Sequence, residues 1–173
     1  KAFQDSNYLY ILMEYCEGGD LLNVMEEPIA ESDTILYWAE IVRAVHSVHA
    51  LGYIHRDIKP DNVLVKANGH ICLTDFGSCS LLNDKGLVTG TFAVGTPDYV
   101  SPEILDTTVK KYGVECDWWS CGVMFYEMLY EKTPFAGATL IETYANIQRG
   151  TFDFPSTDNT VELLRQDLIK KLL

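Results

Sequence analysis

Hydrophobic and polar positions divide the first part of the chain into a strand and a long helix. Residues 8–15 form a nearly unbroken apolar run, which predicts a buried strand. After it, apolar residues recur every three or four positions from Ser32 to about Leu51, which predicts an amphipathic helix. Ser32 is a candidate cap for its beginning, and Gly52 stands where a left-handed residue commonly ends a helix.

The last third of the chain predicts further helices. Residues 114–130 are apolar on nearly every side, which is typical of a helix inside a core. A membrane span is not expected there, because the run is short and contains Asp117 and Glu127. Residues 138–149 and 161–173 also have helical patterns, and a loop separates them. Strands and helices together indicate an α+β fold.

Composition limits the classes of function. The 173 residues are 47% hydrophobic and 12% aromatic, which suffices for a packed core in one domain or part of one. The formal net charge is −12, from 25 acidic and 13 basic residues. A nucleic-acid-binding surface would be basic, so that class is not expected. The charge fits basic partners, or it is a solvated acidic surface.

The cysteines and the first residue suggest where the chain belongs. The five cysteines are odd in number and form no Cys-x-x-Cys pair. Reduced thiols in a cytoplasmic protein are therefore expected. No signal peptide is visible, and Lys1 is not an initiator methionine, so we expect an excised piece of a longer protein.

A hairpin in the middle of the chain carries the candidate chemistry. An Asn-Gly turn signal at 68–69 separates the apolar runs 63–65 and 71–73, which predicts two antiparallel strands. Asn62 opens the first strand and Asp75 follows the second. Because the strands are antiparallel, both side chains are expected at the same end of the hairpin.

Asp57 lies on the loop that leads into this end, so three oxygen-bearing side chains are expected to converge. Mg²⁺ prefers oxygen ligands, and Asn62 and Asp75 suit it. Asp57 is then left to orient a hydroxyl group and receive its proton, as phosphoryl transfer requires. The alternative is an Asx-rich turn that binds no metal.

Two motifs at this hairpin resemble those of the eukaryotic protein kinases. His-Arg-Asp at 55–57, followed by Asn62, is similar to the catalytic loop of that family, and Asp-Phe-Gly at 75–77 is similar to its metal-binding motif. Lysine at position 59 is typical of the serine/threonine kinases rather than the tyrosine kinases.

Three further segments, at 18–21, 95–103 and 115–120, resemble the AGC group, and within it the myotonic-dystrophy, Rho-associated and citron kinases. The resemblance implies a protein-kinase-like fold with a mainly helical C-terminal lobe and small β-hairpins. Residues 1–20 would be the end of the small lobe and the hinge, and residues 21–173 a truncated large lobe. The N-terminal lobe would be missing.

The resemblance also implies a role for each matching residue. Asp57 would be the base, Lys59 the charge stabiliser, and Asn62 and Asp75 the Mg²⁺ ligands. The residues that would bind ATP are Met13, Glu14, Cys16, Asp20, Asp61, Leu64 and Asp75. Those that would dock the substrate are Thr96, Asp98 and Glu127, and those that would support the site are His55, Arg56, Phe76, Gly77, Glu103 and Asp117.

Two positions raise questions of regulation and metal binding. In many relatives a phosphothreonine stands four residues before the threonine matched by Thr96, but Phe92 occupies that place here, with Thr89 and Thr91 out of register.

His46 and His49 are three residues apart, as metal ligands can be. Because no third ligand is near, we interpret them as ordinary helix-face histidines.

The expected function is transfer of the γ-phosphoryl group of ATP to serine or threonine in proteins. Basic residues upstream of the target would meet Asp20, Asp61, Asp98 and Glu127. Small-GTPase and cytoskeletal partners would bind outside residues 1–173, and no nucleic acid or membrane span is expected. Residues 1–173 alone are expected to be inactive. A pseudokinase scaffold and an interaction module are the alternatives.

Overall fold

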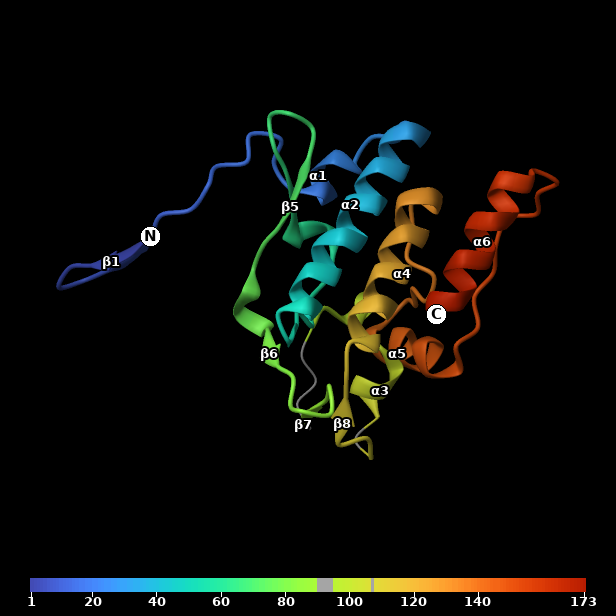
Figure 1. The fold of residues 1–173 in the computed structure, drawn as a ribbon. Helices are drawn as coiled ribbons and strands as arrows, with labels where there is room; N and C mark the ends of the chain where they lie inside the picture. Colours follow the sequence, from blue (N-terminus) through green and yellow to red (C-terminus); the bar gives the residue numbers. More distant parts are fainter. Residues whose placement is uncertain (90–94, 107) are drawn as a thin grey trace.

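The computed structural model describes residues 1–89, 95–106 and 108–173 (Figure 1). Its helices are α1 (Leu21–Val24), α2 (Glu31–Ala50), α3 (Pro102–Leu105), α4 (Glu115–Tyr130), α5 (Leu140–Arg149) and α6 (Thr160–Leu172). Its strands are β1 (Ala2–Gln4), β2 (Leu9–Ile11), β3 (Tyr53–Ile54), β4 (Val63–Val65), β5 (Ile71–Leu73), β6 (Ser80–Leu81), β7 (Val88–Thr89) and β8 (Lys111–Tyr112). The strands pair antiparallel as β1–β2, β3–β6, β4–β5 and β7–β8.

The core lies between α2 and α4, which run side by side in Figure 1. The ring of Trp38 on α2 stacks on Phe125 of α4 with centroids 4.5 Å apart. Helix α4 is buried around most of its circumference, as its apolar pattern predicts. Gly122 lets α6 approach closely, since a Cβ there would lie 2.8 Å from Cβ of Leu172.

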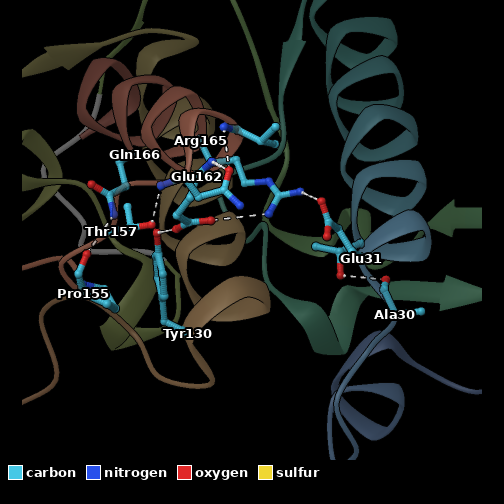
Figure 2. Close-up of polar contacts among 11 residues, drawn as sticks. Ala30, Glu31, Tyr130, Pro155, Thr157, Glu162, Arg165 and Gln166 are labelled. Carbon is cyan, nitrogen blue, oxygen red and sulfur yellow. Dashed lines mark hydrogen bonds and ion pairs between the residues drawn. The ribbon is translucent and has the colours of Figure 1, made fainter.

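A polar network fastens α6 to the other two long helices (Figure 2). Arg165 of α6 bonds to Glu31 at the start of α2 and, at 3.4 Å, to Glu162. The hydroxyl of Tyr130, at the end of α4, donates to the other oxygen of Glu162. This network holds the C-terminal helix against the core in addition to its apolar packing.

Two expectations about local structure are wrong. The run at 8–15 forms only the short strand β2, which pairs with β1, and its side chains are exposed: Leu9 is 68% and Ile11 64% exposed. An apolar run predicts a strand but not what covers it, and the β1–β2 hairpin projects away from the helices in Figure 1. Ser32 does not cap α2 either, because the helix begins at Glu31 and Ser32 lies in its first turn.

The remaining boundaries agree with the sequence pattern to within one or two residues. Gly52 has φ +82° and its N–H donates to the carbonyl of His49 at 2.9 Å, so it ends α2 as predicted. Across the described ranges, the structure contains no helix with the length and apolar character that crossing a bilayer requires.

Candidate active site

The central hairpin forms as predicted and fixes the ends of two functional segments. Strands β4 and β5 pair with Val63 opposite Leu73, and Gly69 takes the turn at φ +81°. Beyond the last pair, the N–H of Thr74 donates to the carbonyl of Asn62 at 2.9 Å. Asn62 and Asp75 therefore stand at the same end of the hairpin.

Asp57 is the centre of a tight group of polar contacts at this end. Its Oδ1 accepts from the hydroxyl of Thr96 at 3.0 Å, and its Oδ2 accepts from Nδ2 of Asn62 at 3.0 Å. The ammonium group of Lys59 lies 3.4 Å from Oδ2 and donates to the Thr96 hydroxyl at 2.7 Å. The carboxylate is mostly buried, so these contacts hold it in one orientation.

The two predicted Mg²⁺ ligands have oxygens that suit a cation. Nδ2 of Asn62 is occupied by the carbonyl and the carboxylate of Asp57, which directs the amide oxygen away from them. Asp75 is exposed, has the left-handed φ of +56°, and accepts from the N–H of Gly77 through Oδ1 at 3.2 Å. No cluster of three or more His, Cys, Asp or Glu side chains suited to a metal exists among the described residues. A cation here would therefore need the Asn62 amide and oxygens from its own ligand.

Asp117, fully buried on α4, holds the segment that precedes Asp57. Its oxygens accept from the backbone N–H of His55 at 2.8 Å and of Arg56 at 2.7 Å, as the resemblance implies. Arg56 has φ +69°, a conformation that costs a non-glycine residue about 1–3 kcal/mol. Hydrogen bonds to a buried carboxylate offset that strain.

His49 also reaches Asp117, and here the sequence interpretation is wrong. Its Nε2 lies 2.8 Å from Oδ2 of Asp117, and its side chain is only 9% exposed. It is therefore a buried partner of Asp117 rather than an ordinary helix-face histidine. The two residues are 68 positions apart, and no local pattern joins them.

His55 and Phe76 connect the two motifs. Their rings meet edge to face with centroids 5.2 Å apart, and Nε2 of His55 lies 3.0 Å from the carbonyl of Thr74. Gly77 has Oδ1 of Asp75 only 3.1 Å from where a Cβ would be, so a larger residue would crowd that carboxylate. These contacts hold the two segments together.

The guanidinium of Arg56 is occupied by neighbouring oxygens. Its Nε donates to the carbonyl of Ser78 at 2.6 Å, and its Nη1 donates to the hydroxyl of Tyr112 at 3.1 Å. Thr89 lies on β7, whereas Thr91 and Phe92 lie outside the described residues. In this structure the guanidinium of Arg56 therefore donates to one carbonyl oxygen and one hydroxyl oxygen.

A hollow of about 610 Å³ lies beside β5 and Asp75. The expected ATP-binding residues that line it are Met13, Glu14, Cys16, Leu64 and Asp75. Asp20 is not among them: its carboxylate caps α1, accepting from the N–H of Asn23 at 2.8 Å and from its side chain at 2.9 Å. Asp61 is exposed and also lies outside this lining.

Three acidic side chains, those of Glu127, Asp98 and Asp61, lie near one another. Glu127 accepts from the hydroxyl of Tyr99 at 2.6 Å, and Asp98 accepts from Thr133 at 3.4 Å. Burial chiefly raises the pKa of Glu127, and the negative charges of Asp98 and Asp61 raise it further. These three acidic groups therefore share one region.

Glu103 is one of the residues expected to support the site. It lies in the first turn of α3 and is half-buried. Within the described residues it forms no ion pair.

Comparison with known proteins decides the family. The whole chain, residues 1–173, matches the family described as "Protein kinase domain". The chain belongs to the protein kinase family. Among its relatives, the serine/threonine-protein kinase MRCK beta of Rattus norvegicus is 52% identical, and MRCK gamma of Homo sapiens is 50% identical, each over 99% of this chain. MRCK alpha of Homo sapiens is 51% identical over the same share.

These kinases confirm the expected subfamily, the myotonic-dystrophy, Rho-associated and citron branch of the AGC group. The kinase chain covers 10–12% of the three relatives, so it spans about a tenth of the length of the curated relatives it matches.

Proposed function

We propose that the protein containing this chain transfers the γ-phosphoryl group of ATP to serine and threonine hydroxyls of protein substrates. One observation carries the proposal: Thr96, Asn62 and Lys59 surround the carboxylate of Asp57 with contacts of 3.0, 3.0 and 3.4 Å. The relatives are named serine/threonine-protein kinases, which supports the same reaction. Residues 1–20 are proposed to be the end of the small lobe and the hinge, and residues 21–173 the large lobe.

In this mechanism Asp57 orients the substrate hydroxyl and accepts its proton. A strongly basic carboxylate is not needed, because in a loose transition state the proton leaves late and positioning contributes most of the rate. The ammonium group of Lys59, near both Asp57 and Thr96, places positive charge where the phosphoryl group transfers. Thr96 positions the base and the lysine together.

The side-chain oxygens of Asn62 and Asp75 are suited to bind Mg²⁺ together with ATP. The Asn62 amide oxygen and the exposed Asp75 carboxylate are hard oxygen ligands, and phosphate oxygens complete such a site in many phosphoryl-transfer proteins. Bound Mg²⁺ would neutralise charge on the phosphates. The adenine is proposed to occupy the 610 Å³ hollow, with backbone groups of Glu14 and Cys16 facing it.

Substrates are proposed to carry arginine or lysine near the target residue. Burial raises the pKa of Glu127, and the negative charges of Asp98 and Asp61 raise it further, so a basic side chain would relieve that repulsion. Asp20, as the cap of α1, contributes to this surface only if its contacts with Asn23 open. A cytoplasmic role in cytoskeletal signalling, with small-GTPase and cytoskeletal partners bound outside residues 1–173, completes the proposal.

The test replaces Asp75 by asparagine in the whole protein and measures phosphate transfer to a serine peptide while Mg²⁺ is titrated. The proposal expects a large loss of transfer that added Mg²⁺ restores at most partly, whereas Asp158→Asn, an exposed control, has the parental rate. Parental transfer from Asp75→Asn would contradict it. ATP binding without any transfer by the parental protein would instead support a pseudokinase.

Residues 1–173 alone are proposed to be inactive, because this stretch contains no Gly-rich phosphate loop and no matching strand lysine. Equal turnover from residues 1–173 and from the whole protein would contradict this.

A further inference from the structure

Two cysteines from different segments line the same hollow. Cys16 lies in the stretch before α1, and Cys72 lies on β5. The first stretch is fixed to β4 because the N–H of Gly18 donates to the carbonyl of Val65 at 2.9 Å. Cys72 is fixed to the same strand, opposite Leu64. Strand β4 thus holds both cysteines in place, one on each side of it.

The two thiols are neighbours in the lining of this hollow. Burial raises the pKa of Cys16, and charge repulsion and a hydrogen bond involving the Cys72 thiol raise it further. The ammonium group of Lys66, which lies 3.2 Å from a carboxylate oxygen of Glu14, is also near the pair, and its positive charge opposes part of the rise in the pKa of Cys16. The pair therefore has a neighbouring cation.

The other three cysteines have different surroundings. Cys121 is fully buried and Cys116 nearly so, and burial raises the pKa of each. Cys79 is half-buried in a separate hollow with Phe76 and Tyr53. No second cysteine is among the groups that shift the pKa of any of these three, all of which lie in the described part of the chain.

We propose that Cys16 and Cys72 form a peroxide-sensitive thiol pair, which closes to a disulfide across the hollow and lowers its affinity for nucleotide. The thiol chemistry does not depend on the function proposed above; only the effect on nucleotide rests on it. The disulfide would join the stretch before α1 to β5, where the adenine is proposed to lie.

The oxidant is a hydroperoxide such as hydrogen peroxide, and the reaction balances with it alone. The thiolate of Cys72, the more exposed of the two, attacks a peroxide oxygen. The O–O bond breaks, a sulfenic acid forms, and the released hydroxide takes up the thiol proton as water. The Cys16 sulfur then attacks the sulfenic sulfur, the S–O bond breaks, and a second water leaves. In sum, two thiols and one peroxide give one disulfide and two waters.

The experiment treats the whole protein with hydrogen peroxide under native conditions, blocks remaining thiols with N-ethylmaleimide, and maps linked peptides by mass spectrometry without reduction. The expected product is a Cys16–Cys72 link, two hydrogens lighter than the reduced pair, that dithiothreitol reverses. Cys79→Ser, the matched control, forms the link at the parental rate. Lys66→Met forms it more slowly, because the cation that opposes the rise in the pKa of Cys16 is gone.

Separate oxidation of Cys16 and Cys72 to sulfinic acids, with no link between them, would overturn the proposal. So would a link that forms only after the protein is unfolded. A further arm adds ATP with Mg²⁺ before the peroxide and is expected to slow the link. If the link forms but ATP does not slow it, the thiol pair stands and the nucleotide position is wrong. If ATP binds and no link forms, only the thiol pair is wrong.

Discussion

Replacing Asp117 by asparagine should loosen the backbone immediately before the proposed base. The parental carboxylate accepts from the N–H of His55, the N–H of Arg56 and Nε2 of His49, at 2.8, 2.7 and 2.8 Å. An asparagine side chain has one acceptor oxygen, so its NH₂ group must face either the His55 or the Arg56 N–H. At least one buried backbone donor is then unpaired.

The expected cost follows from these contacts. An unpaired buried donor costs about 1–3 kcal/mol, and loss of charge assistance from the remaining bonds adds about 1 kcal/mol. The sum is about 2–4 kcal/mol. Arg56, at φ +69°, would also be released from a strained conformation, which displaces the adjoining Asp57.

Native-state hydrogen exchange of the whole protein measures this effect locally. A loss of about 2–4 kcal/mol predicts roughly 30-fold to several-hundred-fold faster exchange of the His55 and Arg56 amides, since each 1.4 kcal/mol is about tenfold. Asp158→Asn, an exposed control, should leave their exchange unchanged. Parental protection in Asp117→Asn would show that the carboxylate does not hold this segment and would refute the reasoning.

Three further predictions concern charge, packing and catalysis. Burial raises the pKa of Glu127 above its ordinary 4.5, so its contribution to stability is present below that value and is lost as pH rises through the raised pKa. The free energy of unfolding of Glu127→Gln, measured with urea, should therefore fall less than that of the parental protein as pH rises from 4.5 through the raised pKa. An equal dependence of that free energy on pH in both proteins would contradict this. Gly122→Ala should destabilise by about 1–2 kcal/mol in spite of better helix propensity, because its Cβ meets Leu172 at 2.8 Å; a more stable variant would disprove that close contact. Lys59→Met should lower phosphate transfer by at least about tenfold with little change in ATP affinity, and equal losses of both would assign Lys59 to binding instead.

Local signals predicted the hairpin that carries the candidate site. Asp57, Asn62 and Asp75 lie within 19 residues of one another, and one Asn-Gly turn was sufficient to predict that the ends of β4 and β5 meet. The support from Asp117 is 61–62 residues away from the backbone it holds, so it followed only from resemblance to the kinase family. His49 had neither kind of signal and was misinterpreted.

Tertiary packing explains the other differences. The apolar run at 8–15 predicted a strand correctly, but burial depends on which element covers it, and no element of the described residues covers the β1–β2 hairpin. At the start of α2, three consecutive polar residues could each begin the helix. The structure starts it at Glu31, so that Glu31 and Asp33 place negative charge in the first turn, where the helix dipole favours it.

The most direct test of the active-site assignment is phosphate transfer by Asp57→Asn in the whole protein, with ATP binding measured on the same preparation. Asparagine keeps the size of the side chain and can still accept from Thr96, but it cannot take up a proton as the carboxylate does. The account predicts a fall of about 100-fold or more in transfer to a serine peptide while ATP affinity is retained. Transfer at the parental rate would contradict it.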